Sequence, residues 1–216
     1  MLIAKGIYKN YGELKILQGV DISVKEGEIV SIVGSSGAGK TTLLQILGTL
    51  DKPDQGKISI NGTDLLSLSG NKMAAFRNSQ IGFIFQFHQL LPEFNAYENV
   101  MLPALILGLS KKEASEQAKN LLSKIGLESR FNHRPSELSG GEQQRIAVCR
   151  SLINKPKVIF ADEPSGNLDT KNARELHELF FNLRDEFKQT FVIVTHNEEL
   201  AKMADRSLSM RDGKFI

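Results

Sequence analysis

The chain has 216 residues, of which 41% are hydrophobic and 24% charged, the composition of an ordinary globular protein with a substantial core. Its 27 Lys and Arg residues nearly balance its 25 Asp and Glu residues, and no basic block stands out, so charge argues against a nucleic-acid partner. The single cysteine, Cys149, excludes an internal disulfide, and the longest apolar run, residues 100–109, is about half the length of a membrane span and contains Pro103.

The N-terminal part of the chain is typical of short antiparallel strands. Residues 3–12, 17–28 and 56–62 are bounded by glycines or by an Asn-Gly pair, which favour tight turns. Charged residues appear too early for these segments to include a signal peptide. We therefore expect a small antiparallel sheet at this end of the molecule.

A glycine-rich loop follows the first wholly apolar run, residues 28–34, and precedes a helical pattern over residues 41–50. The loop has the sequence GSSGAGKT and matches GxxxxGK[ST] in the strand-to-helix context that this phosphate-binding motif requires. Its glycines let backbone N–H groups face an anion, Lys40 reaches the β- and γ-phosphates, and the Thr41 hydroxyl can bind Mg²⁺. The sequence thus predicts a nucleotide site formed by Gly34, Ser35, Ser36, Gly37, Ala38, Gly39, Lys40, Thr41 and Thr42.

A helical segment interrupts the chain after the next apolar run, residues 81–86. Residues 92–109 and 110–126 have helical spacing, Ser110 with Glu113 forms a capping box, and Gly126 is a suitable helix stop. We interpret residues 87–138 as a helical subdomain inserted between core segments 1–86 and 139–216 of one domain.

A second small-residue turn opens a helix at LSGGEQQR, residues 138–145. Ser139, Gly140 and Gly141 precede an amphipathic helix, so they form another N-terminus that attracts anions. A simple helix cap would account for Ser139 but not for the whole string. Cys149 follows within this helix, where a small buried apolar side chain is the simplest interpretation.

Strand and helix patterns then alternate. Apolar runs at residues 157–163 and 191–196 are followed by helical patterns at 170–187 and 197–206. Short runs that are apolar throughout are typical of strands buried on both faces of a parallel sheet. The predicted fold class is α/β, with a mostly parallel core sheet, N-terminal antiparallel strands and the inserted helices.

Polar residues follow the apolar runs at one predicted edge of this sheet. Asp162 and Glu163, Gln86 and His196 each close a run, and ligands of open parallel sheets lie at the carboxyl ends of the strands. Taken singly, each could be a solvated loop residue or a polar strand end. Beside a phosphate loop, Asp162 would bind magnesium through water and Glu163 would orient the attacking water. Gln86 would be a magnesium or water ligand, and His196 a neutral hydrogen-bond partner of the γ-phosphate.

These motifs resemble those of the ATP-binding cassette (ABC) ATPases. LSGGEQQR is similar to that family's signature sequence and lies between Gln86 and Asp162, as the family order requires. Further similarities are Tyr11 in KNYG, SGNLD at residues 165–169 and the Thr-His pair at 195–196. The resemblance implies an ATPase of the P-loop NTPase class that uses ATP and Mg²⁺, with Lys40, Glu163 and His196 catalytic and Tyr11 stacked on adenine. Tyr8 lies close to Tyr11 in the sequence, and either ring could instead serve simple packing.

The resemblance also answers why a second anion-seeking turn is present. In this family two cassettes pair head to tail, and each ATP lies between one chain's phosphate loop and the signature of the other. Ser139, Gly140 and Gly141 would then bind ATP held by a second copy of the chain, and Asp169 would lie at the interface. The inserted helices would contact integral membrane permease subunits.

Within the family, the sequence is most similar to the lipoprotein-releasing cassettes of Gram-negative bacteria. These are peripheral on the cytoplasmic face of the inner membrane and power transfer of outer-membrane-directed lipoproteins to a periplasmic carrier. Macrolide-efflux and cell-division cassettes share the SGNLD form and are the alternative. A DNA-repair ATPase would need a coiled coil or zinc module between the phosphate loop and the signature, and that interval has neither heptads nor Cys pairs. A translation factor would need two cassettes in one chain, and this chain has one set of motifs. A small-molecule kinase would explain the phosphate loop but not the signature.

Overall fold

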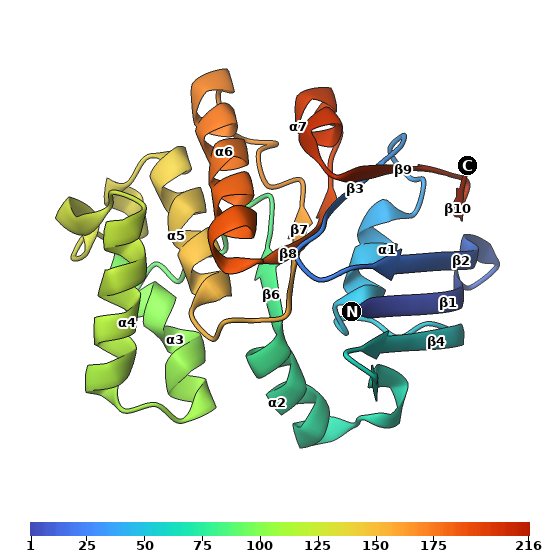
Figure 1. Cartoon of the computed structure of the whole chain (residues 1–216), viewed down its shortest axis with the longest axis horizontal. Coiled ribbons are helices and arrows are strands. Elements are labelled where there is room, and N and C mark those ends of the chain that lie inside the picture. The colour runs from blue at the N-terminus through green and yellow to red at the C-terminus, as the bar shows by residue number, and fades with distance from the viewer.

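The computed structural model describes residues 1–216 and contains two sheets (Figure 1). The larger sheet has six strands in the order β10-β9-β3-β8-β7-β6, and every pair except β10 with β9 is parallel. Its central strands are apolar throughout because helices cover both faces. This confirms the predicted parallel core. The strands are β3 (Ile29–Val33), β6 (Ile81–Ile84), β7 (Val158–Asp162), β8 (Thr190–Val194), β9 (Arg206–Arg211) and β10 (Lys214–Phe215).

The smaller sheet is antiparallel and has the order β2-β1-β4-β5. Leu2 pairs with Val24 on one side and with Ile60 on the other, which places three buried side chains in one row. The predicted N-terminal antiparallel strands are therefore confirmed. They are β1 (Leu2–Tyr11), β2 (Leu14–Val24), β4 (Gln55–Ile60) and β5 (Thr63–Asp64).

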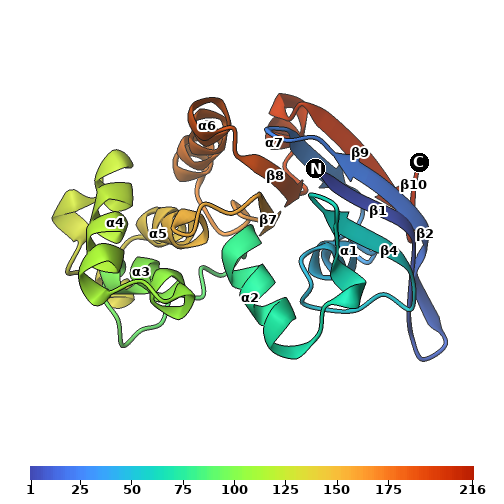
Figure 2. The ribbon, with the colours of Figure 1, turned by 60° about the horizontal axis from the view of Figure 1, so that its bottom comes forward.

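Helix α1 (Lys40–Leu47) lies between the two sheets, and its apolar side chains join both in one core. On the other face of the parallel sheet, α5 (Gly140–Leu152) and α6 (Thr170–Phe187) pack on the strands (Figures 1 and 2). Phe180 of α6 meets Phe191 of β8 with ring centroids 5.2 Å apart, and both rings are fully buried. Truncating such a ring costs about 3–5 kcal/mol, so this contact is a major anchor of the layer.

The predicted helical segment contains α3 (Ala96–Leu107) and α4 (Lys111–Lys124), which lie at the opposite end of the molecule from the antiparallel sheet (Figure 2). The capping box of Ser110 with Glu113 is present, and Gly126 follows α4 with a φ of 72° that favours glycine. Helix α5 contributes to two apolar clusters. Ile146 and Cys149 pack with α3 and α4, while Val148 packs on the parallel sheet. Short 3₁₀ turns complete this region and the approach to α2: Leu65–Ser67, Glu128–Arg130 and Pro135–Glu137.

Two regions differ from the sequence-based expectation. Helix α2 (Gly70–Gln80) was not predicted, because none of its residues is buried and no apolar face marks it. Strands β9 and β10 were also not predicted, since β9 alternates in burial instead of being apolar throughout. The helix predicted over residues 197–206 is shorter, α7 (Glu198–Met203), because the chain enters β9 at Arg206.

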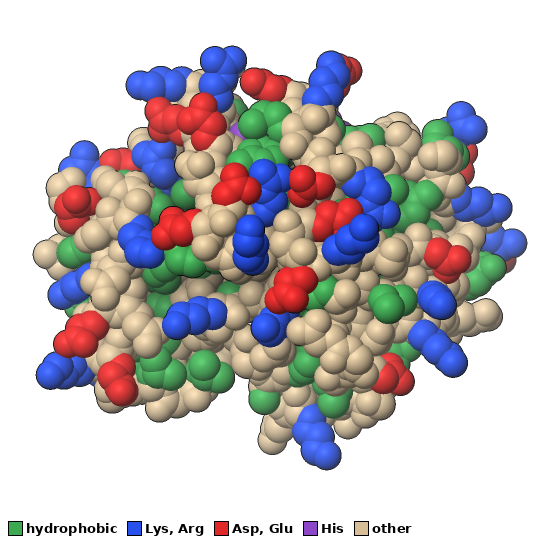
Figure 3. Space-filling view, in the orientation of Figure 1, with side chains coloured by type: hydrophobic (Ala, Val, Ile, Leu, Met, Phe, Trp, Pro, Cys, Tyr) green, Lys and Arg blue, Asp and Glu red, His purple; other side chains and the backbone are tan.

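Two further properties concern the surface and the cysteine. Lys and Arg side chains are interspersed with Asp and Glu over the face drawn in Figure 3, so no field of a single sign covers it. None of the helices combines the length and apolarity needed to cross a membrane.

Cys149 is buried, as the simplest interpretation predicted, and burial raises the pKa of its thiol.

Candidate functional site

A pocket of about 330 Å³ lies at the edge of the parallel sheet where β3, β7 and β8 end. It contains residues from the phosphate loop, from the segment after β6 and from the ends of β7 and β8. Gln86 reaches it although β6 ends two residues earlier than expected, at Ile84. The lining residues are Ile16, Ser36, Gly37, Gly39, Lys40, Thr41, Thr42, Gln86, Asp162, Glu163 and His196. All but Ile16 were predicted from the sequence.

The phosphate loop depends on two glycines for its shape. Gly39 is the N-cap of α1 with a φ of 100°, a conformation that side chains disfavour. A Cβ at Gly34 would overlap the Met210 carbonyl oxygen of β9, so the loop could not approach the neighbouring strand with any larger residue. The part of the loop that does not line the pocket consists of Gly34, Ser35 and Ala38. The loop thus joins β3 to α1 with its backbone curled beside the pocket.

Lys40 is nearly buried and is held by its own loop. Its Nζ donates to the carbonyl oxygens of Gly34 at 2.8 Å and of Ser35 at 2.9 Å. A buried ammonium needs such partners to offset the loss of hydration. The structure therefore holds a fixed positive charge at the pocket, at the N-terminus of α1.

Thr41 and Asp162 form a pair of oxygen donors in the pocket lining. The Thr41 hydroxyl donates to Asp162 Oδ1 at 3.1 Å. Burial raises the pKa of Asp162, while the Thr41 hydrogen bond and the charges of Lys40 and His196 act in the opposite direction. A hydroxyl and a partly buried carboxylate are hard oxygen donors of the kind that Mg²⁺ prefers, so the two residues fit this ion.

Glu163 and His196 contact each other at two points. The His196 backbone N–H donates to Glu163 Oε2 at 3.1 Å, and His196 Nε2 lies 2.8 Å from Oε1. Burial raises the pKa of Glu163, and the His196 N–H partly offsets this effect. Glu163 has a φ of 46°, and its backbone N–H donates to Val194 O at 2.9 Å across the ends of β7 and β8. The Glu163 backbone and one oxygen of its carboxylate are thereby each held by a hydrogen bond.

Gln86 is tied to a residue that the sequence did not single out. Its Nε2 donates to Asn167 Oδ1 at 3.1 Å, and Asn167 Nδ2 donates to Gln86 O at 3.3 Å. Because the amide nitrogen is engaged, the amide oxygen is the atom that can act as a ligand. The only sequence signal for Asn167 was its place within SGNLD.

The turn formed by Ser139, Gly140 and Gly141, at the N-terminus of α5, lies outside this pocket, because none of the three residues lines it. Ser139 caps α5 by accepting from the Glu142 N–H, and Glu142 accepts from the Ser139 N–H at 2.8 Å. Burial tends to raise the pKa of Glu142, but hydrogen bonds from Arg130 and Ser139 lower it to about 2. The turn is thus a rigid, charged cap on a helix N-terminus.

Asp169 is the N-cap of α6 and connects to the same turn. It accepts hydrogen bonds from the backbone N–H and the side-chain Nδ2 of Asn172, at 2.8 and 2.7 Å. Asn172 packs so closely on Gly141 that a Cβ there would overlap Asn172 Oδ1. Asp169, the predicted interface residue, is therefore connected through Asn172 to Gly141 of the same chain.

Tyr11 lies outside the pocket lining and is half exposed. Its hydroxyl donates to Asp51 Oδ2 at 2.7 Å. The neighbouring Tyr8 instead packs against Gly19 of β2. The adenine-stacking role of Tyr11 stays a prediction, and its partner Asp51 could not be predicted from the sequence.

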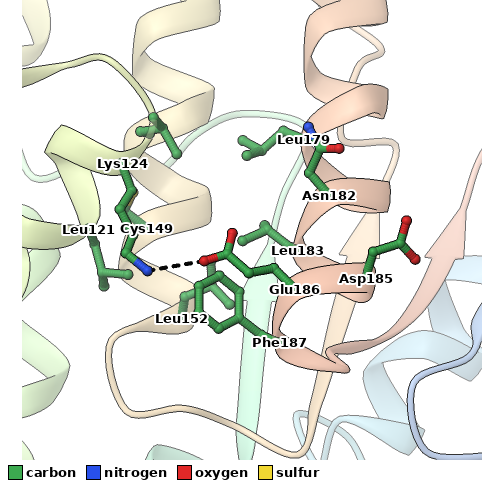
Figure 4. A pocket seen from close by; sticks show the side chains of 11 residues that line it. Leu121, Lys124, Cys149, Leu152, Leu179, Asn182, Leu183, Asp185, Glu186 and Phe187 are labelled. Carbon is green, nitrogen blue, oxygen red and sulfur yellow. Dashed lines mark hydrogen bonds and ion pairs between the residues drawn. The ribbon is translucent and has the colours of Figure 1, made fainter.

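A larger cavity, of about 530 Å³, lies between α4, α5 and α6 (Figure 4). Most of its lining is apolar, and Lys124 faces Glu186 across it at 3.3 Å. None of the residues with predicted chemistry lines it. It lies between the inserted helices and the core rather than at the nucleotide edge.

Comparisons with known proteins agree with this geometry. A family model described as "ABC transporter" matches residues 17–166. The chain is 59% identical to the lipoprotein-releasing system ATP-binding protein LolD of Bacteroides fragilis YCH46, over all of both proteins. It is 62% identical to LolD of Porphyromonas gingivalis W83, over 97% of this chain and 96% of the relative. A solved dimer of the cassette MJ0796 with ADP and Pi is 38% identical, with a TM-score of 0.90 over 100% of this chain and 96% of that one.

Proposed function

The chain belongs to the ABC transporter family as an ATP-binding ATPase subunit, and we propose that it powers lipoprotein release at a bacterial inner membrane. Identity of about 60% over the whole chain to proteins named for lipoprotein release is the observation that carries this proposal. The ATP-binding role does not depend on the cargo, because it is performed by residues of the nucleotide pocket.

ATP binding is the task of the phosphate loop. Its backbone N–H groups and the N-terminus of α1 attract the phosphates, and Lys40 supplies a full positive charge. When phosphates enter, the Lys40 ammonium can exchange its bonds to Gly34 and Ser35 for bonds to phosphate oxygens. Tyr11 would stack on the base.

Thr41, Asp162 and Gln86 are the residues that would hold Mg²⁺. When bound, the ion neutralises charge on the β- and γ-phosphate oxygens. Thr41 offers its hydroxyl, Asp162 its carboxylate and Gln86 its amide oxygen, and the Thr41–Asp162 contact of 3.1 Å keeps two of these donors together.

Glu163 is the residue placed to orient the attacking water. Its carboxylate lies in the pocket and its raised pKa reflects a partly desolvated base, which accepts a proton more readily than an exposed carboxylate. His196 holds the carboxylate through its backbone and approaches it through Nε2, so it both positions Glu163 and lies where a γ-phosphate would be sensed.

We infer that two copies assemble head to tail. The observation that supports this is the separation of the phosphate pocket from the Ser139–Gly141 turn within one chain, since the latter has the properties of an anion site without lining the former. A second copy would place its turn on the open side of the pocket. Asp169, joined to the turn through Asn172, would lie at that contact.

A groove of about 410 Å³ between α2, α3 and α5 is the proposed contact with a permease subunit. Its lining combines apolar and polar side chains, and Ile106, which belongs to it, is 75% exposed. Phe87, on the segment between β6 and α3, is 70% exposed. A large exposed apolar side chain at a groove is compatible with a protein interface. Arg150 donates to the carbonyls of His88 and Gln89, which fixes the segment that leads from Gln86 to the groove. Movement at the groove would therefore reach the nucleotide pocket.

Depletion of the chain in its host tests the proposed cargo. We expect outer-membrane-directed lipoproteins to accumulate in the inner membrane, and an affinity-tagged chain to co-purify permease subunits from a detergent extract. Normal lipoprotein sorting after depletion would exclude this cargo and favour the efflux or cell-division alternatives. Co-purification of ribosomes or DNA in place of membrane subunits would reject a transport role.

A further inference from the structure

The Tyr11 ring is fixed by an arrangement that extends beyond Tyr11 itself. Tyr11 ends β1, and Lys9, two residues earlier on the same side of the strand, is buried with only 8% of its surface exposed. Lys9 Nζ lies 5.0 Å from the centroid of the Tyr11 ring. One side of an aromatic ring that is 50% exposed is thus next to a buried positive charge.

Asp51 joins the ring and the ammonium. Its Oδ2 accepts from the Tyr11 hydroxyl at 2.7 Å and lies 2.9 Å from Lys9 Nζ, while its Oδ1 accepts from Lys9 at 3.0 Å. Lys9 also donates to Lys52 O at 2.7 Å. These bonds connect the end of β1 to the loop after α1, the helix that begins with Lys40. The ring is therefore tied to the segment that follows α1.

We propose that Asp51 and Lys9 are positioning residues that fix the Tyr11 ring as a preformed platform for the nucleotide base. This proposal rests on the proposed function, in which Tyr11 stacks on adenine. Without the Asp51 bond, a half-exposed ring would have to be ordered when the base binds, and this loss of side-chain freedom would weaken binding. The hydrogen bond removes that cost before binding.

Lys9 has a second effect on the ring. Stacked aromatic rings repel each other through their electron-rich faces. An ammonium near one face attracts that electron density, and the opposite face becomes a better partner for a purine. The hydrogen bond to Asp51 and burial both raise the pKa of Tyr11, so its hydroxyl stays protonated and continues to donate.

A merely structural role for Asp51 and Lys9 would stabilise the hairpin without affecting the base. The two roles are separated by comparing Mg-ADP, which has a base, with inorganic pyrophosphate, which has none, by calorimetric titration of the full chain. Neither ligand has a γ-phosphate to be hydrolysed, so the affinity is measured without turnover.

The variants are Tyr11→Phe, Asp51→Ala, Lys9→Met and Tyr11→Ala. We expect the first three to weaken ADP about three- to tenfold and to leave pyrophosphate within about twofold. Lys9→Arg, which keeps the charge, should retain most of the affinity for ADP. Tyr11→Ala should weaken ADP about tenfold or more, since it removes the stack itself.

Asn10→Ala is the matched control. Asn10 Nδ2 donates to Asp54 at 2.9 Å, so this change also removes a bond between the hairpin and the same loop but does not touch Tyr11. The ratio of ADP to pyrophosphate affinity should stay that of the unaltered chain. Tyr11→Phe removes a single oxygen and keeps the test decisive if Asp51→Ala does not fold.

Three results would overturn the proposal. If Tyr11→Ala weakens ADP while Tyr11→Phe and Asp51→Ala bind it normally, the ring acts alone and the positioning role is wrong. If the variants weaken pyrophosphate as much as ADP, Asp51 and Lys9 serve only the structure of the hairpin. If instead Tyr11→Ala binds ADP normally, the stacking role of Tyr11 fails as well, and with it that part of the proposed function.

Discussion

The backbone N–H of His196 donates a hydrogen bond to Glu163 Oε2 at 3.1 Å, and His196 Nε2 lies 2.8 Å from Oε1, which is buried and accepts no hydrogen bond. The two residues come from the ends of neighbouring parallel strands, β7 and β8, whose register sets their separation. A base that is already oriented does not have to be ordered in the transition state. This orientation supports the proposed role of Glu163 in activating water.

Replacement of Glu163 by Gln should abolish turnover while ATP still binds. The amide keeps the size of the side chain but cannot accept a proton, and loss of a general base lowers rates about 10²- to 10⁴-fold. Steady-state release of phosphate and equilibrium binding of ATP measure the two effects separately. Glu198→Gln, an exposed change on α7, is the control and should keep full turnover. Brisk hydrolysis by the Glu163 variant would refute its role.

Replacement of Gly141 by Ala should destabilise the chain by about 1–3 kcal/mol. The added Cβ would overlap Asn172 Oδ1, so Asn172 would have to turn away and lose its bond to Asp169. Chemical denaturation gives the free energy of unfolding. In Gly140→Ala the nearest atom to the new Cβ is 3.7 Å away, so this neighbouring change should be tolerated.

A second substitution identifies the clash as the cause. In an Asn172→Ala background, Gly141→Ala should cost much less stability than it does in the unaltered chain, because the overlapping Oδ1 is gone. Equal stability of Gly141→Ala and the unaltered chain would show that the turn is not packed as described.

Glu142→Gln should lower stability at neutral pH by about 1–2 kcal/mol. The folded-state pKa of Glu142, about 2, lies below the ordinary value of 4.5, so the ionised carboxylate stabilises the fold above pH 4.5. That contribution is lost as pH falls from 4.5 toward 2, and the two proteins should converge there. Denaturation at a series of pH values measures the difference.

Glu113→Gln provides the comparison, since Glu113 forms the same kind of cap on α4 but is fully exposed. Its effect should be smaller. A Glu142 variant whose loss of stability does not change with pH would show that the carboxylate charge is not what matters.

The ion pair across the cavity of Figure 4 should contribute little. The side chains of Lys124 and Glu186 are 53% and 61% exposed, and such pairs give about 0–1 kcal/mol. Lys124→Met should therefore change the free energy of unfolding by less than about 1 kcal/mol, whereas Leu122→Ala, at a fully buried position of the same helix, should cost about 2–5 kcal/mol. Similar costs for both would mean that the ion pair, and not apolar packing, holds α4 to the core.

Elements buried on two faces could be predicted from the sequence, whereas exposed ones could not. The strand at Phe191 is apolar throughout because helices cover both of its faces, so composition alone identifies it. Helix α2 buries none of its residues, and β9 alternates, so neither leaves a comparable signal. Their structure depends on tertiary contacts: β9 pairs with β3, and α2 leads directly into β6.

The pocket residues could be predicted for a related reason. The carboxyl ends of parallel strands meet at one edge, so the ends of the apolar runs brought Asp162, Glu163 and His196 together. Contacts between side chains of distant segments could not be predicted. Gln86 meets Asn167 across 81 residues, and Tyr11 meets Asp51 across 40, with no periodicity to relate them.

The ATP-dependent association of two protomers tests the central claim most directly. Light scattering during size-exclusion chromatography should show that Glu163→Gln, in saturating Mg-ATP, has twice the mass of one chain. Adding Ser139→Arg should return it to the mass of one chain while equilibrium binding of ATP persists. A Glu163→Gln protein that stays a single protomer in saturating Mg-ATP would contradict the account.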